Sequence, residues 1–323
     1  MYFDAHSDIW CDVTARRLRG ETDVLRKHHL DRLRKGGVEG SIFVIWVDPP
    51  YDVDYVKRTK DIMDCARAEI AECGEIRIVH TYDEMMRAKA DGKIYVFNGI
   101  EGMAAIGEDL SKIDDYYDFG CRHAILTWNE ANALGAGANS GEDYGLTQVG
   151  KEAARRVQEK GMLLDVSHLN EAGFWDIAKL ATKPIIASHS NSKALCDVPR
   201  NLTDDQLRAI RDLDGVVGLN AFNLFVDHDP ARQTVENLAR HAAHMVDVMG
   251  IDHVGCGFDF FEFVNQDAMG SITEKGSPST TGLRDCSEIP NLFACLEKMG
   301  MTKEEMEKIA RRNFQNIIQK AVG

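Results

Sequence analysis

Six residues that can bind a metal ion or move a proton are spread along this chain. Each of them lies at the end of a short apolar run or just after one. The six residues are His6, Asp8, Glu101, His168, His189 and Asp259. His6 and Asp8, in the opening stretch "YFDAHSDIW", are two residues apart, so in a strand their side chains point to the same face. One such residue alone is usually structural, but three imidazoles and three carboxylates that converge suit Zn²⁺ or a similar divalent ion. A pair of ions needs a bridging carboxylate, and Glu101 is the natural candidate.

The elements that must position these residues can be read from the hydrophobic pattern. Short β-branched runs predict eight strands, at Tyr2–His6, Gly40–Val47, Lys93–Gly99, His123–Thr127, Met162–Val166, Pro184–Ser188, Val216–Asn220 and His253–Gly257. Amphipathic stretches predict helices, at Val24–Lys35, Val53–Cys73, Tyr82–Ala90, Leu110–Phe119, Thr147–Lys160, Glu171–Leu180, Thr203–Asp212 and Ala231–Met249. The residues expected to cap helices are Ser111, Asn170 and Thr203.

This alternation favours one fold class. Eight strands, each followed by a helix, are the pattern of an α/β protein with a (β/α)8 TIM barrel. A doubly wound sheet is the alternative, but eight regular units favour closure. Because no linker or change of composition divides the chain, we expect residues 1–323 to form a single barrel domain. Two C-terminal helices, Ile289–Lys298 and Thr302–Ala321, complete the prediction.

In such a barrel, the catalytic groups lie at the carboxyl ends of the strands. The six residues all follow this rule, in segments such as "VFNGIEGM", "LLDVSHLN", "PIIASHSNS" and "VGCGFDFF". We therefore expect them to meet at one rim of the barrel. The long polar segment of residues 262–288, after the eighth strand, is interpreted as a structureless active-site loop.

Composition excludes several functions. The net charge is −14, from 38 basic and 52 acidic residues, and no cluster of Lys and Arg stands out, which argues against binding of nucleic acid or an anionic membrane. No run approaches 18 apolar residues and no signal-peptide pattern begins the chain, so we expect no membrane span or export. The eight cysteines form no CxxC pairs, which is typical of free thiols in a reducing cytoplasm.

Several stretches, in the same order along almost the whole chain, resemble the membrane (renal) dipeptidases, peptidase family M19, which have a metal-dependent amidohydrolase-type barrel. "DAHSD" resembles the family's D-x-H-x-D motif, and "GIEGM" resembles its glutamate motif. "LLDVSHLN" and "IIASHSNS" are similar to the paired histidine motifs, "VPRNLTDDQL" to the arginine motif and "GFDF" to the final aspartate motif.

The resemblance implies a zinc-dependent dipeptidase that uses a metal-bound hydroxide at a binuclear site, with two Zn²⁺ per chain. It implies that His6 and Asp8 bind one ion, that His168 and His189 bind the other, and that Glu101 bridges them. Family substrates are dipeptides, often with tolerance of a D-residue at the C-terminal position. A homodimer is expected by analogy with the family.

The resemblance also implies two substrate contacts. The guanidinium of Arg200 would hold the C-terminal carboxylate of the dipeptide through a bidentate fork. Asp259 would hydrogen-bond the bridging water or the substrate amine and carry the proton between them. With Glu101, it is the expected catalytic residue.

One motif departs from the pattern of the best-known members. Trp128, in "ILTWNEANALG", stands where those members have a histidine that polarises the scissile carbonyl, and this variant is associated with bacterial relatives. An indole donates one N–H but cannot ionise. We expect Trp128 and Asn129 to contact substrate, with Asn129 either replacing the histidine or only shaping the loop. For Trp10 and Tyr144, packing is favoured over lining the pocket.

Two other functions remain open at this point. One is a hydrolase of the same barrel type that acts on another small amide, a lactone or a small ester. The other is a non-catalytic metal-binding protein, which would be expected to have lost some ligands or Asp259, yet every matched position is filled.

Overall fold

The centre of the molecule is a ring of parallel strands. The computed structural model describes residues 1–264 and 279–323. Within them one sheet has nine strands: β1 (Tyr2–Ser7), β2 (Val38–Trp46), β3 (Ile76–Ile78), β4 (Ile94–Glu101), β5 (Cys121–Ile125), β6 (Leu163–Asp165), β7 (Ile185–Ala187), β8 (Val216–Leu219) and β9 (Val254–Cys256). Eight of them pair in parallel in the order β1-β2-β4-β5-β6-β7-β8-β9, and β3 pairs with β4 outside this path. The predicted (β/α)8 barrel is confirmed.

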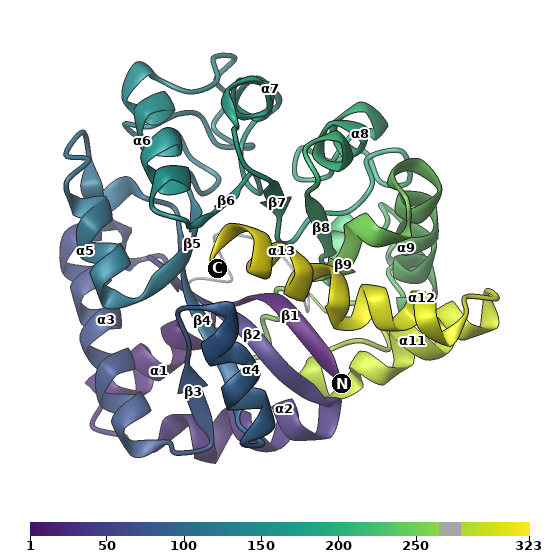
Figure 1. Ribbon diagram of the computed structural model, residues 1–323, viewed down its shortest axis with the longest axis horizontal. Helices are drawn as coiled ribbons and strands as arrows, with labels where there is room; N and C mark the ends of the chain where they lie inside the picture. Colours follow the sequence, from purple (N-terminus) through teal and green to yellow (C-terminus); the bar gives the residue numbers. More distant parts are fainter. Residues whose placement is uncertain (265–278) are drawn as a thin grey trace.

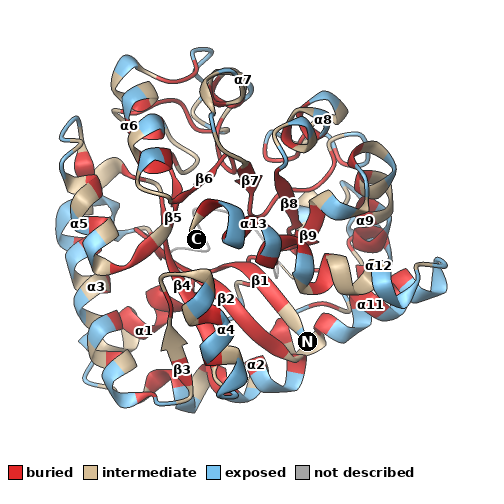
Figure 2. Cartoon of the chain, in the orientation of Figure 1, coloured by how far each residue is buried: buried red, intermediate tan, exposed pale blue. Residues whose placement is uncertain are grey.

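Helices surround this ring and cover its outer face (Figure 1). They are α1 (Ile9–Leu18), α2 (Leu30–Gly36), α3 (Tyr55–Glu72), α4 (Tyr82–Ala90), α5 (Lys112–Phe119), α6 (Gln148–Glu159), α7 (Glu171–Leu180), α8 (Asp204–Asp212), α9 (Val235–Met249), α11 (Ile289–Lys298), α12 (Lys303–Glu307) and α13 (Asn313–Ala321). The strands are almost entirely buried, whereas the helices expose one side (Figure 2). Strands covered on both faces are expected to be largely apolar, and the polar residues that these strands do contain, such as His6 in β1 and Glu101 in β4, are buried.

The two ends of the strand order meet at a seam that a side chain holds together. The Asp4 carboxylate in β1 accepts hydrogen bonds from the Phe258 N–H beyond β9 (2.8 Å) and from the His6 N–H (3.4 Å). Among the described residues, no backbone ladder joins β1 to β9. The barrel is therefore nearly closed, with a buried carboxylate in place of the last ladder.

Helix α13 closes the amino-terminal end of the barrel. The ring of Phe314 packs against that of Phe3, with 5.8 Å between their centroids. The Gln315 amide donates to Glu39 Oε1 (2.7 Å) at the start of β2 and to the hydroxyl of Tyr95 (2.9 Å) in β4. The opposite end, where the strands finish, is left open for the site.

Sequence and structure differ at two elements. All eight predicted strands are present within a few residues of their predicted bounds, but β3 and α1 were not predicted. In α1, residues Ile9 to Thr14 are all buried, so the alternation of apolar and polar residues that marks an amphipathic helix is absent. β3 has only three residues, too few for a period to appear.

Of the three predicted caps, two are confirmed and one is wrong. The side chain of Asn170 accepts from the Gly173 N–H, and that of Thr203 accepts from the Gln206 N–H. Ser111 instead donates its hydroxyl to Asp109 Oδ1 (2.6 Å) and makes no cap hydrogen bond.

The predicted loop of residues 262–288 lies partly outside the described residues, at 265–278. Its last part is not structureless, because Thr281 pairs with Thr234 and a 3-10 turn spans Cys286–Glu288. In the described ranges, no helix has both the length and the apolar character needed to cross a bilayer. The cytoplasmic location and the homodimer stay predictions.

Candidate metal centre and substrate pocket

The six residues singled out in the sequence lie together at the carboxyl ends of the strands. His6 is in β1 and Asp8 follows it, and Glu101 is the last residue of β4. His168, His189 and Asp259 lie two or three residues beyond β6, β7 and β9, respectively. All six residues are buried. The fold therefore assembles them from five different strand ends, as expected for a barrel whose catalytic groups lie at the carboxyl ends of its strands.

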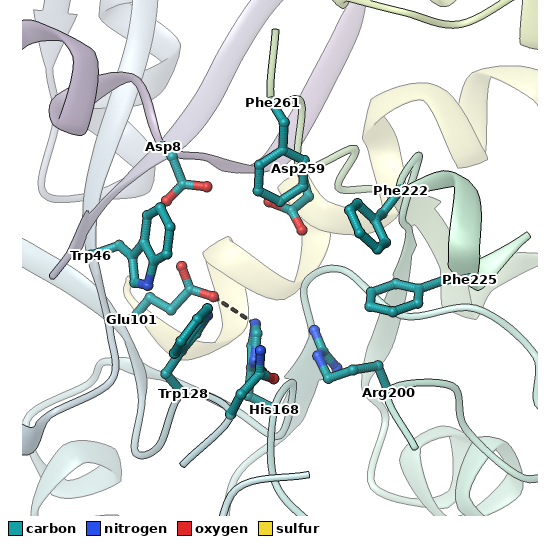
Figure 3. A pocket seen from close by; sticks show the side chains of 11 residues that line it. Asp8, Trp46, Glu101, Trp128, His168, Arg200, Phe222, Phe225, Asp259 and Phe261 are labelled. Carbon is teal, nitrogen blue, oxygen red and sulfur yellow. Dashed lines mark hydrogen bonds and ion pairs between the residues drawn. The ribbon is translucent and has the colours of Figure 1, made fainter. Parts of the chain in front are cut away.

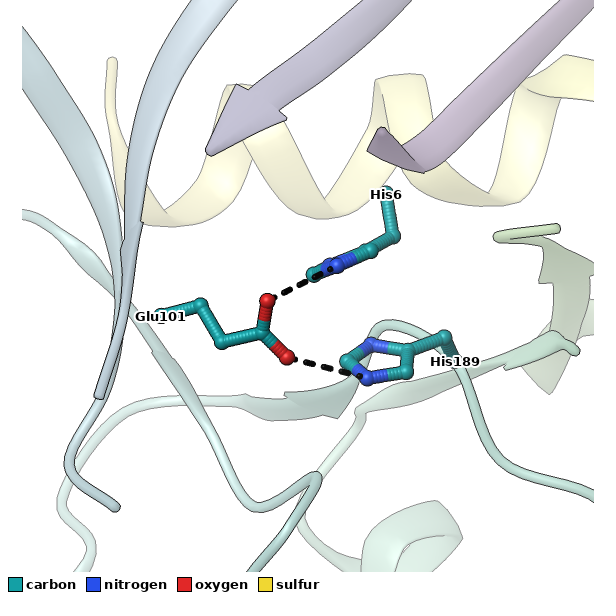
Figure 4. A group of neighbouring side chains, drawn as sticks. All are labelled: His6, Glu101 and His189. Carbon is teal, nitrogen blue, oxygen red and sulfur yellow. Dashed lines mark ion pairs between the residues drawn. The ribbon is translucent and has the colours of Figure 1, made fainter. Parts of the chain in front are cut away.

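The Glu101 carboxylate lies between the imidazole of His6 on one side and those of His168 and His189 on the other. Its Oε2 is 3.3 Å from Nε2 of His6, and its Oε1 is 2.7 Å from Nε2 of His168 and 3.5 Å from Nε2 of His189 (Figure 4 shows His6 and His189). The Nε2 atoms of His168 and His189 are 2.8 Å apart. Each oxygen of Glu101 thus faces its own set of imidazoles, which is the arrangement a bridging ligand needs.

Atoms without partners show that these residues fit metal ions. Within the described residues, both ring nitrogens of His6 and Oδ1 of Asp8 are buried and lack a hydrogen-bond partner. Buried polar atoms are nearly always paired, so these atoms require a partner that the chain does not supply. The possible ligand atoms lie within 4.8 Å of one another in two groups, one of His6, Glu101 and His189 and one of His6, Asp8 and Asp259. Imidazole nitrogen and carboxylate oxygen are the ligands that zinc prefers.

The electrostatics of the cluster also favour a cation. Burial, and then the neighbouring Glu101 carboxylate, raise the pKa of Asp8 well above its usual range. Burial lowers the pKa of His168 to about 4 and that of His189 well below its ordinary value, so both imidazoles are neutral at pH 7. These two imidazoles are therefore in the neutral state that binds metal. Burial lowers the pKa of His6, but the neighbouring carboxylates, first that of Glu101, outweigh it and raise this pKa to about 10, so His6 must lose a proton when it binds an ion.

Two neighbouring side chains fix the orientation of the histidines. Nδ1 of His168 is 2.9 Å from Oδ1 of Asn129, and Nδ1 of His189 is 2.7 Å from Oγ of Ser188. The amide oxygen of Asn129 can only accept, so it holds the hydrogen on Nδ1 of His168 and leaves the Nε2 lone pair directed at Glu101, whereas the Ser188 hydroxyl can accept from or donate to His189. Asn129 therefore contacts a candidate ligand, so it does more than shape the loop.

We expect Asn129→Leu to weaken metal binding or activity by roughly 10- to 100-fold, the usual effect of losing a hydrogen-bond partner of a metal-binding histidine. Asn129→Asp keeps the acceptor oxygen and should retain most of the affinity. Metal content after dialysis against a graded chelator series measures the difference. Equal metal retention in the wild type and the leucine variant would contradict this role.

The backbone is left-handed at two of the six residues. The φ angles are 68° at His168 and 58° at Asp259. Left-handed conformations are uncommon for residues other than glycine and concentrate at functional sites. In addition, a Cβ atom at Gly218 or Gly257 would lie 1.9 or 1.7 Å from the Ser188 carbonyl oxygen. Glycine at both positions lets β8 and β9 approach the segment that carries His189.

A pocket of about 350 Å³ opens beside this cluster (Figure 3). Its lining includes Asp8, Glu101, His168, Asp259, Trp128, Asn129 and Arg200, together with Trp46, Phe222, Phe225 and Phe261. Arg200 is buried, its Nε has no hydrogen-bond partner within the described residues, and its Nη2 donates to the His189 carbonyl (3.3 Å). Burial lowers the pKa of Arg200 to about 10, which leaves it charged at neutral pH.

Some residues of the site were not predicted from the sequence. Trp46, Phe222, Phe225 and Phe261 line the pocket, and Asn220 donates to Asp259 Oδ2 (3.0 Å). Trp46 lies in an apolar strand and looks like a core residue, and Phe222 and Phe225 follow β8 without a recognisable motif, so only Phe261, next to the aspartate motif "GFDF", carried a local signal.

The two aromatic residues considered for the pocket are not among its lining residues. Trp10 is buried in the core and donates to Asn98 Oδ1 (3.1 Å), as the packing interpretation predicted. Tyr144 is exposed and lies outside the pocket, so it neither packs in the core nor lines the pocket.

A (β/α)8 barrel with histidines and carboxylates gathered at the carboxyl ends of its strands has the architecture of metal-dependent hydrolases. The model of the membrane dipeptidase family (peptidase family M19) matches residues 1–322, so the chain belongs to this metallopeptidase family. The resemblance seen in the sequence is thereby confirmed.

Relatives and solved structures agree with this assignment. An uncharacterized protein encoded in the pqqA 5′ region of Klebsiella pneumoniae is 34% identical over 254 residues, which are 76% of this chain and 89% of that protein. The M19 metallopeptidase dipeptidase AC superposes with a TM-score of 0.87 at 27% identity, covering 100% of this chain and 99% of that one. A Rhodobacter sphaeroides metallopeptidase bound to a phosphinate mimic of L-Ala-D-Ala has a TM-score of 0.86 at 26% identity, covering 99% of both chains.

Proposed function

We propose that this protein is a binuclear zinc dipeptidase that hydrolyses L,L and L,D dipeptides. The observation that carries the proposal is the position of Glu101, whose two carboxylate oxygens face separate sets of imidazole nitrogens. The peptide mimic in the Rhodobacter sphaeroides relative supports a dipeptide substrate. The pocket lies directly beside these residues, with Glu101, Arg200 and Asp259 in its lining.

In this proposal His6 and Asp8 hold one ion, His168 and His189 hold the other, and Glu101 joins the two. Bound divalent ions lower the pKa of water from 15.7 to about 7 and so supply a nucleophile at neutral pH.

Other side chains bind the substrate, transfer the proton and shape the pocket. Arg200 binds the C-terminal carboxylate of the dipeptide, and Asp259 accepts a proton and returns it to the leaving amine. Trp128 and the neighbouring aromatic residues exclude water from the pocket. Asn129 holds His168 in the orientation described above.

The test is metal analysis of the purified protein together with a substrate panel. We expect close to two divalent ions per chain, loss of activity on chelation and its return with Zn²⁺, because five ligand candidates exceed what one four-coordinate site with an open position uses. The panel compares L,L and L,D dipeptides with small lactones. A consistent content of one ion would remove Glu101 from its bridging role. Turnover of lactones without turnover of dipeptides would replace the proposed function with the alternative hydrolase.

A further inference from the structure

A buried pair of an imidazole and a carboxylate lies close to the candidate metal centre, and neither residue lines the pocket. Nε2 of His123 in β5 is 2.6 Å from Oδ2 of Asp165, the last residue of β6, and both side chains are fully buried. The strands β4, β5, β6 and β7 follow one another around the barrel (Figure 1). Three of these strands lead to candidate ligands, which are Glu101, His168 and His189.

The Asp165 carboxylate accepts hydrogen bonds from the two turns that carry His168 and His189. Its Oδ1 accepts from the Ser167 N–H (2.8 Å), and the Ser188 nitrogen is 3.2 Å from each of its oxygens. Ser167 directly precedes His168 in the chain, and Ser188 directly precedes His189. The carboxylate therefore joins the ends of β6 and β7 at the residues next to two candidate ligands.

A further hydrogen bond connects the same two turns. The backbone N–H of His189 donates to the hydroxyl of Ser167 (3.3 Å). The backbone of His168, the residue after Ser167, has the left-handed φ of 68°. A residue other than glycine keeps such a conformation only where its surroundings hold it. The bonds made by Asp165 and Ser167 are the contacts that hold this turn against its neighbour.

The carboxylate is itself fixed by His123. Burial raises the pKa of Asp165, but His123, first through its hydrogen bond, outweighs burial and holds this pKa below its ordinary value. Asp165 is therefore ionised and only accepts, so Nε2 of His123 carries the hydrogen. Among the described residues, Nδ1 of His123 has no hydrogen-bond partner. A Cβ atom at Gly99 in β4 would lie 2.4 Å from this Nδ1, so glycine there makes room for the ring.

We propose that Asp165, together with the hydroxyl of Ser167, sets the spacing of His168 and His189 and thereby the affinity for the ion that these two histidines hold. Asp165 and Ser167 are thus positioning residues. The inference rests on the proposed function, which assigns this ion to the two histidines. The other ion takes its ligands from the ends of β1 and β4, so its affinity should change much less.

The test is the metal content of purified variants after dialysis against buffers of graded free Zn²⁺ concentration. Asp165→Ala should lose one ion at a free Zn²⁺ concentration roughly 10- to 100-fold higher than the wild type does, the usual effect of losing a group that orients metal ligands. It should keep the second ion as the wild type does. Asp165→Asn retains an acceptor oxygen for the two backbone N–H groups and should keep most of the affinity. Ser167→Ala should weaken the same ion to a smaller extent, and it decides the question if Asp165→Ala does not fold.

The matched control is Asp12→Ala, which breaks a pair of the same kind in α1, outside the pocket. Asp12 and His29 are both buried, and 2.8 Å separates Oδ2 of Asp12 from Nε2 of His29. This variant should keep both ions while its unfolding temperature falls. The comparison therefore separates a loss of metal affinity from a loss of stability.

The outcomes distinguish this inference from the proposed function. If the wild type holds fewer than two ions, the binuclear site fails and the inference fails with it. If the wild type holds two ions and both alanine variants, at Asp165 and Ser167, keep them with unchanged affinity, only the inference is overturned. Equal weakening of both ions, or the same weakening in Asp12→Ala, would assign the effect to stability and also overturn it. An equally large loss in Asp165→Asn would make the charge the cause, against a role in positioning.

Discussion

Asp259→Asn is expected to lower kcat by roughly 10² to 10⁴, the usual contribution of general acid–base catalysis, while metal content and fold are preserved. Asparagine is almost the same size as aspartate but cannot take up a proton at neutral pH. The local structure suits the change, since Asp259 has a φ of 58°, and asparagine tolerates this conformation better than most residues. The amide oxygen of the variant can still accept the hydrogen bond from Asn220.

The measurement is steady-state kinetics together with metal analysis of the same preparation. Because Arg200 and the metal ligands are unchanged, KM should change far less than kcat. Asp214→Asn is a matched control, since Asp214 has a similar φ of 56° but is exposed and pairs with Lys320. Near-normal turnover by Asp259→Asn would assign proton transfer to another group. Loss of one ion would make Asp259 a metal ligand, as its distance of 3.8 Å from His6 Nε2 also permits.

Arg200→Met is expected to lower kcat/KM for dipeptides by roughly 10² to 10³, because truncating one partner of a buried charge pair costs about 2–5 kcal/mol. The guanidinium is buried and its Nε is unpaired among the described residues, so the substrate carboxylate is its natural partner. Arg200→Lys should give an intermediate loss in the form of a raised KM, since an ammonium group cannot reproduce the bidentate fork.

The control for the Arg200 substitutions is a comparison of dipeptides with their C-terminal amides. C-terminal dipeptide amides lack the carboxylate, so the wild type should use them poorly and the substitutions should affect them little. Equal losses on dipeptides and their amides would show that Arg200 does not bind the carboxylate. In that case its hydrogen bond to the His189 carbonyl would be its main role.

The sequence was sufficient to predict the barrel and the assembly of the six residues, because both depend on local patterns. Short apolar runs mark the strands, and one topological rule places residues such as Glu101 and His189 at the same rim. The parts that could not be predicted depend on three-dimensional packing. Trp46 looks like any other apolar residue in "IFVIWV", and only the fold shows that it lines the pocket. Likewise, no spacing rule relates Asn129 to His168, which is 39 residues away.

The seam between β1 and β9 links the assembly of the site to the last stage of folding. The hydrogen bond from Phe258 to Asp4 joins residues 254 positions apart, and the candidate ligands His6 and Asp8 lie on one side of this seam while Asp259 lies on the other. Contacts between such distant parts of a chain form slowly, because the entropy of closing the loop opposes them. The candidate ligands His6 and Asp8 therefore wait for the segment after β9 to be made before the ring can close around them. A ligand held by His6 or Asp8 on one side and by Asp259 on the other stabilises only the closed ring, so binding at this site and completion of the barrel are thermodynamically linked.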